Sequence, residues 1–176
     1  MMSRLILVYG GIAGTVELAL LALTMGLVSD HGNMGMVLGY LSMLIAMSMV
    51  FVGVKRFRDE QQGGVIRFGK AFLVGLGIAG VACLFYVLGW EAYMWATDYT
   101  FMDTFTASEL ARMEAAHASA AEIAKFKADM AEFAEMYRQP LSRMLMTLME
   151  ISPVALLVPL ISAALLRNPR FMPARA

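Results

Sequence analysis

The sequence has little of the chemistry that soluble enzymes commonly use. Cys83 is the single cysteine, and only two histidines occur among 176 residues. One cysteine excludes an internal disulfide and a cysteine-based zinc site, while His31 and His117 are too far apart to define a zinc site by themselves. The sequence also lacks a P-loop, an HExxH helix, a nucleophile elbow and an aspartate-rich prenyl-diphosphate motif. We therefore expect no cofactor and no enzymatic activity.

Charge is scarce as well. Only 16% of the residues are charged, whereas 60% are hydrophobic, and the mean hydropathy is +0.66. This is far more apolar surface than a soluble domain of this length could bury. We expect the lipid bilayer to be the main partner of the chain, and we expect no nucleic-acid partner. From Leu5 to Val28 the only charged residue is Glu17.

Hydropathy predicts four transmembrane helices in a single membrane domain of residues 1–176. The expected spans are about 5–28, 34–54, 71–95 and 144–166. Each is close to the roughly 20 residues that a helix needs to cross a bilayer core. The connector 29–33 is rich in turn-forming residues, so the first two spans should form a tight antiparallel hairpin. The predicted fold class is an all-α membrane protein, a four-helix bundle with an extracytoplasmic amphipathic helical insertion between helices 3 and 4.

Basic residues concentrate on one side of these spans. Nine basic and two acidic residues lie with the termini and the loop from Lys55 to Lys70, against five basic and nine acidic residues on the other side. The positive-inside rule predicts that both termini and this loop are cytoplasmic. Segment 98–139 is then external.

The predicted cytoplasmic loop has a basic cluster around a double glycine. Its four candidate contact residues are Arg56, Arg58, Arg67 and Lys70. The P-loop pattern is absent, so the functional interpretation is contact with lipid headgroups or a membrane-protein partner. Asp59 is expected to form an ion pair with Arg56 or Arg67.

The external segment 98–139 has a helical pattern. Two capping-box spacings, Thr106 with Glu109 and Ser119 with Glu122, predict two helices with a break near His117. Apolar residues recur at steps of three and four along the second helix: Ile123, Phe126, Met130, Phe133 and Tyr137. Pro140 suits the first turn of the fourth span. We expect this helical pair to lie on the bilayer surface or over the mouth of the bundle.

Several local strings resemble a known bacterial family. They are YLSMLIAMSMVFVGVKRFRD from Tyr40, GGVIRFGKAF from Gly63, LGWEAY from Leu88, MYRQPLSRM from Met136 and LMEISPVALLVPLISAALLR from Leu148. Together they resemble domain-of-unknown-function family 4199 over nearly the whole chain. The resemblance implies a four-helix integral protein of the bacterial inner (cytoplasmic) membrane without an assigned activity. Ala155 departs from the pattern, because many members have glycine there.

Glu17 is the first of three glutamates that are candidates for a polar core or a functional site. It shares a helical face with Gly10 and Gly14, whose small size lets helices approach closely, so it should point into a helix interface. Three interpretations remain open. Glu17 is a neutral carboxyl bonded to a neighbouring helix, a proton or cation carrier, or a polar contact in an oligomer.

Glu91 and Glu150 are the other two. Glu91 lies 21 residues beyond Lys70, roughly 31 Å along a helix, and Glu150 lies seven residues after Arg143, roughly 10 Å. Both should reach the outer half of the membrane, where they could share a proton or bind a divalent cation. The accessory ligands would be Asp98 and His117. In the structural alternative, which we favour, Glu91 caps its helix, and Glu150 pairs with Arg143 or with a polar group on another helix.

Small residues and prolines should shape the helix contacts. The expected helix-packing positions are Gly10, Gly14, Gly75 and Gly80. Pro153 and Pro159 should bend the fourth helix near Glu150, which hints at a cavity. The glycine-bearing faces also favour a homo-oligomer.

Taken together, these patterns predict a non-enzymatic envelope accessory or assembly factor. One alternative is a small oligomeric transporter or channel for protons, cations or a lipid-linked substrate, using the three glutamates. A third is a metal-dependent membrane enzyme at the outer face, whose metal the sequence does not identify.

Overall fold

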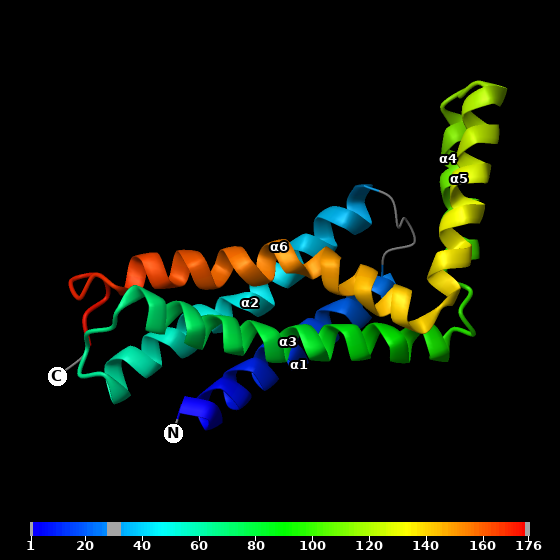
Figure 1. The fold of residues 1–176 in the computed structure, drawn as a ribbon. Coiled ribbons are helices and arrows are strands. Elements are labelled where there is room, and N and C mark those ends of the chain that lie inside the picture. The colour runs from blue at the N-terminus through cyan, green and yellow to red at the C-terminus, as the bar shows by residue number, and fades with distance from the viewer. Residues whose placement is uncertain (1, 28–32, 175–176) are drawn as a thin grey trace.

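The computed structural model describes residues 2–27 and 33–174, and this part of the chain contains six helices and no strand (Figure 1). The helices are α1 (Met2–Leu27), α2 (Asn33–Gln61), α3 (Phe68–Ala96), α4 (Phe101–Ala115), α5 (Ala120–Arg138) and α6 (Pro140–Leu166). Four of them, α1, α2, α3 and α6, are long and apolar enough to cross a membrane, as predicted. The predicted connector 29–33 lies outside the described residues, apart from Asn33.

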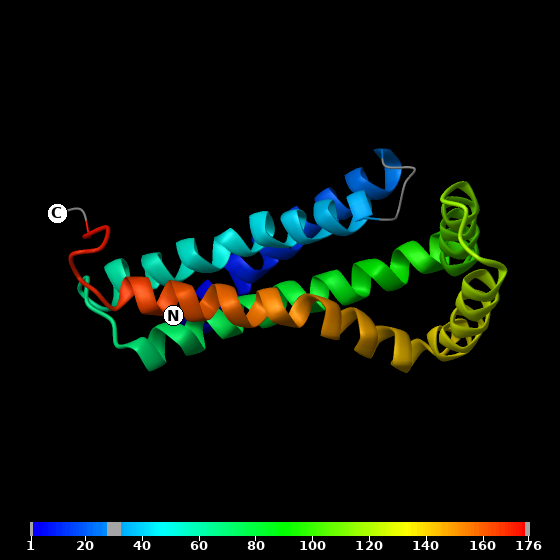
Figure 2. The same cartoon turned by 90° about the horizontal axis from the view of Figure 1, so that it is seen from above.

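The four long helices form a bundle in which α3 contacts each of the others (Figure 2). Its core is built from buried apolar side chains, among them Ala13, Met47, Val50, Ile78 and Ile151. Leucines such as Leu73 and Leu84 on α3 and Leu157 on α6 are exposed on the outside. Large exposed apolar surfaces are rare on soluble monomers, so this outer surface suits lipid.

Glycines let α1 approach α3 closely. A Cβ atom at Gly10 would lie 2.5 Å from Cβ of Val81, and one at Gly14 would lie 2.4 Å from Cβ of Phe85. Both glycines therefore serve a contact between helices of one chain. Gly75 is also at a close helix contact, because a Cβ atom added there would lie 3.0 Å from Cβ of Pro159. Gly80 was expected at a helix contact but is exposed, with no such neighbour within 4 Å.

The start of α1, the loop 62–67 and the end of α6 lie at one end of the bundle (Figure 1). Here the buried Arg58 donates hydrogen bonds to the carbonyls of Phe171 and Met172, at 2.9 and 2.5 Å, and so fastens the segment after α6 to α2. Asp59 pairs with Lys55 and Arg58, at 2.6 Å each. The predicted ion pair of Asp59 with Arg56 or Arg67 is therefore wrong.

The other basic residues of this end are more open. The exposed Arg56 pairs with Glu60 at 2.7 Å and donates to the Tyr9 hydroxyl at 3.1 Å. Lys70 donates to the Gln62 side chain at 2.8 Å, and Arg67 is exposed. The predicted basic cluster is therefore partly structural, since Arg58 is enclosed by protein.

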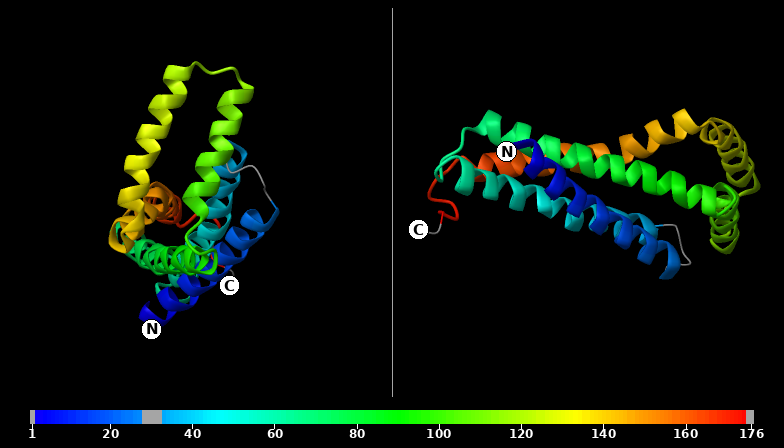
Figure 3. Two further views of the ribbon diagram at one scale, coloured as in Figure 1. Left: turned by 90° about the vertical axis from the view of Figure 1, so that its right-hand side faces the viewer. Right: turned by 90° about the horizontal axis from the view of Figure 1, so that it is seen from below.

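Helices α4 and α5 form a hairpin at the opposite end, and this hairpin extends across the long axis of the bundle (Figures 1 and 3). The predicted capping box at Ser119 and Glu122 is confirmed, and His117 lies at the turn with a φ of 56°. The predicted helix start at Thr106 is wrong. Helix α4 already begins at Phe101, because Asp98 and Tyr99 adopt positive φ angles and turn the chain sharply after α3.

Helix α6 starts with Pro140, as predicted, since the first turn of a helix tolerates the missing N–H of proline. It continues through Pro153 and Pro159 and changes direction along its length (Figure 2). The half that follows the hairpin diverges from α2, and this divergence opens the bundle beside the hairpin.

Candidate functional site

A cavity of about 470 Å³ lies where the bundle meets the α4–α5 hairpin, and all six helices contribute to its wall. Most of the wall is apolar or aromatic: Leu21, Met25, Met36, Met43, Trp90, Phe101, Met102, Phe105, Met130, Phe133 and Met146. The polar groups are few: Glu17, Thr24, Ser42, Tyr86, Tyr137, Thr147 and Glu150. The volume and the apolar lining with a few convergent polar groups are those of a small-molecule site.

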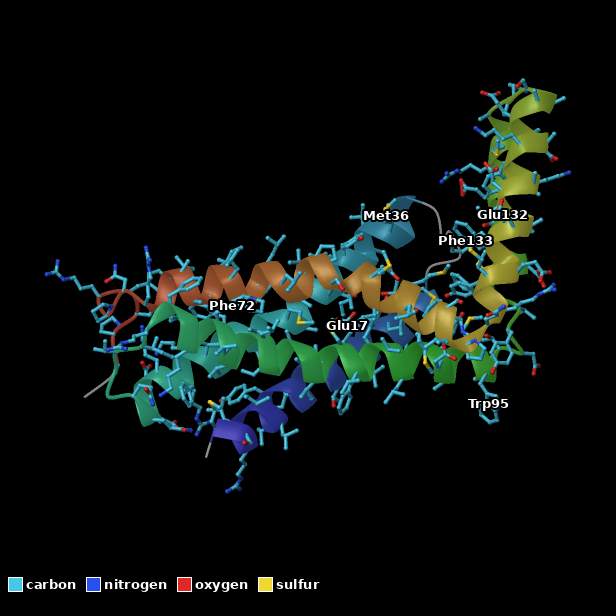
Figure 4. The ribbon with its side chains drawn as sticks, viewed as in Figure 1. Glu17, Met36, Phe72, Trp95, Glu132 and Phe133 are labelled. Carbon is cyan, nitrogen blue, oxygen red and sulfur yellow. The ribbon has the colours of Figure 1, made fainter. Side chains whose placement is uncertain are left out.

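Glu17 enters this cavity from α1 and lies among the bundle helices (Figure 4). It is 2% exposed, and its Oε2 atom has no hydrogen-bond partner among the described residues. Ser42 Oγ lies 3.4 Å from Oε1 but only 2.7 Å from the Gly39 carbonyl. A serine hydroxyl has one proton to donate, and the shorter contact takes it. The Glu17 carboxylate is therefore almost without donors.

Glu150 lines the same cavity from α6. Its side chain is exposed, interacts with the Tyr86 hydroxyl of α3 and lies within electrostatic range of Glu17. Two carboxylates from helices distant in sequence thus face one apolar space. The sequence had grouped Glu17 with Glu150 only in the transporter alternative, which also included Glu91.

Glu91 does not belong to this group. Arg143, which is 2% exposed, donates from Nε to Oε1 of Glu91 at 2.7 Å and from Nη2 to Oε2 at 2.5 Å. Its Nη1 donates to the Tyr137 carbonyl at 3.0 Å, and its guanidinium lies 5.0 Å from the centre of the Tyr99 ring. Arg143 thus pairs with Glu91, so the predicted pairing of Glu150 with Arg143 is wrong. The other predicted option, a polar partner for Glu150 on another helix, agrees with its interaction with Tyr86. The three glutamates do not share one site.

The proposed accessory ligands are also apart. Asp98 is exposed in the turn after α3, and His117 is exposed in the turn between α4 and α5. Across residues 2–27 and 33–174 there is no group of three or more His, Cys, Asp or Glu side chains that could hold a metal ion. The predicted set of Glu91, Glu150, Asp98 and His117 is not brought together. His31 lies outside the described residues.

Trp90 and Tyr137 join the bundle to the hairpin beside the cavity. Trp90 Nε1 donates to the Tyr137 hydroxyl at 2.5 Å, and the Phe101 ring packs edge-on against Trp90 with centroids 4.9 Å apart. Burial raises the pKa of Tyr137 to about 12, so its phenol stays neutral at pH 7. On α5, Phe133 faces the bundle, whereas Trp95 of α3 points away from it (Figure 4).

Sequence reasoning missed several cavity residues. Ser42, Tyr86 and Thr147 are polar residues inside long apolar runs, and this was the available signal. Gly39 was not noticed either. A Cβ atom added there meets no neighbour within 4 Å, because the position borders the open space.

The sequence profile of a family described as "Protein of unknown function (DUF4199)" matches residues 8–168. This range includes every residue that lines the cavity. Searches of curated proteins and of solved structures found no match.

Proposed function

This chain belongs to the DUF4199 family of proteins of unknown function, and we propose that it is a non-enzymatic membrane protein that binds an apolar ligand between its helical bundle and its α4–α5 hairpin. The observation that carries this proposal is the cavity of about 470 Å³. Protein interiors are close-packed and contain few voids larger than a water molecule. A space of this size, walled by methionines and aromatic rings, suits a bound molecule with a hydrocarbon part.

The proposed location is the bacterial inner membrane, with both termini in the cytoplasm. The basic residues Arg56, Arg58, Arg67 and Lys70 support this orientation, because they lie at the end of the bundle opposite the hairpin. The hairpin would then lie along the outer surface of the bilayer, and the cavity would open at the depth of the outer leaflet. Ligand could enter from the lipid or from the outer aqueous phase.

The role that fits this arrangement best is that of an envelope accessory protein. The chain would hold a lipid-like molecule, or a segment of a membrane partner, without transforming it. Its polar wall supplies hydroxyls and carboxylates, and the described residues supply no cysteine, histidine or lysine to the cavity. We therefore propose binding as the primary activity.

A second candidate is a small transporter for protons or cations. The observation that favours it is the placement of Glu17 and Glu150 in one cavity within apolar helices. Glu91 is excluded from this path by its pairing with Arg143. Reconstituted protein would have to carry cations or protons across a liposome membrane, and Glu17→Gln should stop that flux.

Quenching of Trp90 fluorescence tests ligand binding. Trp90 and Trp95 are the only two tryptophans, and Trp95 is 73% exposed and faces away from the cavity. In a Trp95→Phe background in lipid nanodiscs, 12-bromododecan-1-ol should quench Trp90 at low concentration.

Gly39→Leu is the decisive variant, because it fills the cavity from a position with free space around it. We expect it to weaken quenching at least tenfold. Gly80→Leu, at an exposed helix position with similar free space, is the matched control and should change nothing. Equal quenching in both variants would show that the alcohol acts from the surrounding lipid, and the proposed function would be wrong.

A further inference from the structure

The cavity holds two carboxylates and no described basic residue. Glu17 is buried with one oxygen atom unpartnered, and Glu150 faces the same space from another helix. An ionised carboxylate in an apolar environment is strongly disfavoured unless a cation or several hydrogen bonds compensate it. Among the described residues, the side chains that hydrogen-bond with these two carboxylates are Ser42, with Glu17, and Tyr86, with Glu150.

The nearest buried arginine is not available to them. Arg143 is held by Glu91 through two hydrogen bonds and by the Tyr137 carbonyl through a third. Breaking that arrangement would leave Glu91 without its partner. No described side chain around the cavity therefore supplies a positive charge that complements Glu17 and Glu150, and a cationic ligand would supply one.

The lining identifies the kind of cation. A divalent metal ion takes six or more oxygen ligands or a dense set of carboxylates and imidazoles, and the described residues bring no third His, Cys, Asp or Glu side chain into such a group. A small inorganic ion would also leave most of the apolar wall without a contact. An organic ammonium group attached to a hydrocarbon fits both parts, since aromatic rings such as Tyr86 and Trp90 attract cations through their faces.

We propose that the ligand is an amphiphilic cation. Its ammonium group would lie between Glu17 and Glu150, and its hydrocarbon part would lie against Met25, Met146 and the aromatic wall. This proposal rests on the proposed function and specifies the class of ligand. The chemistry is that of an amine or a quaternary ammonium group carrying a chain. A free amphiphilic amine and the headgroup of an aminophospholipid both provide it.

Paired ligands test the proposal in the Trp95→Phe background. The two quenchers are 12-bromododecyl-trimethylammonium and its neutral counterpart 12-bromododecan-1-ol, measured in phosphatidylglycerol nanodiscs. Native protein should bind the cation at least tenfold more tightly than the alcohol. Glu17→Gln and Glu150→Gln, which keep the side-chain shape, should each remove this preference for the cation over the alcohol. Glu132→Gln, at an exposed position on α5, is the control for surface charge and should keep the full preference.

The outcomes separate the two proposals. Failure of the alcohol to bind native protein would contradict ligand binding in the cavity. Alcohol binding by a variant shows that the variant is folded. If Glu17→Gln, Glu150→Gln and Glu132→Gln all bind the alcohol and all keep the same preference for the cation, the assignment of a cationic ligand is wrong. Ligand binding in the cavity would still stand. Phosphatidylethanolamine added to the nanodiscs should compete with the cation if the natural ligand is a lipid headgroup. A lack of competition, with the preference intact, would assign a free amphiphile.

Discussion

Arg143 of α6 donates two hydrogen bonds to the carboxylate of Glu91 of α3, and this pair lies next to the end of the α4–α5 hairpin. The same guanidinium holds the carbonyl of Tyr137, the last buried residue of α5. One side chain therefore connects two bundle helices and the hairpin. Glu91 is fully committed to this structural task, which leaves Glu17 and Glu150 as the cavity carboxylates.

Loss of Glu91 should be strongly destabilising. Glu91→Ala would leave the guanidinium of Arg143 without its counter-charge at a partly buried site, and the loss of a hydrogen bond between charged groups costs about 1.5–3 kcal/mol. Glu135→Ala breaks an exposed pair with Arg138 and should cost about 0–1 kcal/mol. Thermal unfolding in mild detergent compares them. Similar unfolding temperatures for the two variants would mean that the Arg143 pair contributes nothing to stability.

Gly14 should tolerate no side chain. In Gly14→Ala the new methyl group would overlap Phe85 of α3, and such overpacking costs about 1–3 kcal/mol. Gly11→Ala, on the same helix, meets no neighbour within 4 Å and should change stability by less than about 1 kcal/mol. The unfolding temperature of each variant in the same detergent is the measurement. If Gly11→Ala were the more harmful change, the α1–α3 contact described here would be wrong.

Hydropathy alone was sufficient to predict the four long helices, because a helix that faces lipid must be apolar over a fixed length. The start of α5 was also predictable, since Ser119 and Glu122 satisfy each other locally. The start of α4 was not. Thr106 and Glu109 have the same spacing, but they lie inside α4. This helix already begins at Phe101, directly after the turn at Asp98 and Tyr99.

The cavity itself was only partly predictable. The prolines of α6 suggested an opening near Glu150, but the partner of Arg143 depends on how α3 and α6 are rotated about their axes. Residue spacing along one helix does not determine how that helix is rotated relative to its neighbours. Glu91 and Glu150 both lie at a suitable depth, and only the packed structure distinguishes them.

The orientation of the chain can be tested with single cysteines. Cys83 is buried, and Cys83→Ala gives a cysteine-free background. Val65→Cys places an exposed thiol in the loop between α2 and α3, and Ala116→Cys places one at the turn of the hairpin. In intact bacterial cells a membrane-impermeant maleimide should label residue 116 and spare residue 65. Labelling of residue 65 alone would invert the proposed topology.

The α5 cap should depend on pH. Hydrogen bonds from the Ser119 hydroxyl and backbone N–H lower the pKa of Glu122. Because the folded value lies below the unfolded one, the stabilisation is present above the unfolded pKa and is lost as the pH falls through the folded pKa. Ser119→Ala removes the hydroxyl and should bring the pKa of Glu122 closer to its ordinary value, as followed by carboxyl NMR titration. An unchanged titration in that variant would show that the side-chain bond is not formed.

The most direct test of a ligand cavity is to see where a bromine-labelled chain binds. Crystals of the protein grown with 12-bromododecyl-trimethylammonium, measured at the bromine absorption edge, would show the halogen as an anomalous peak. We predict a peak within the cavity, against Trp90 or Met146, that is absent in Gly39→Leu crystals grown in the same way. Peaks confined to the outer apolar surface around Leu73 and Leu84, with an empty cavity, would contradict it.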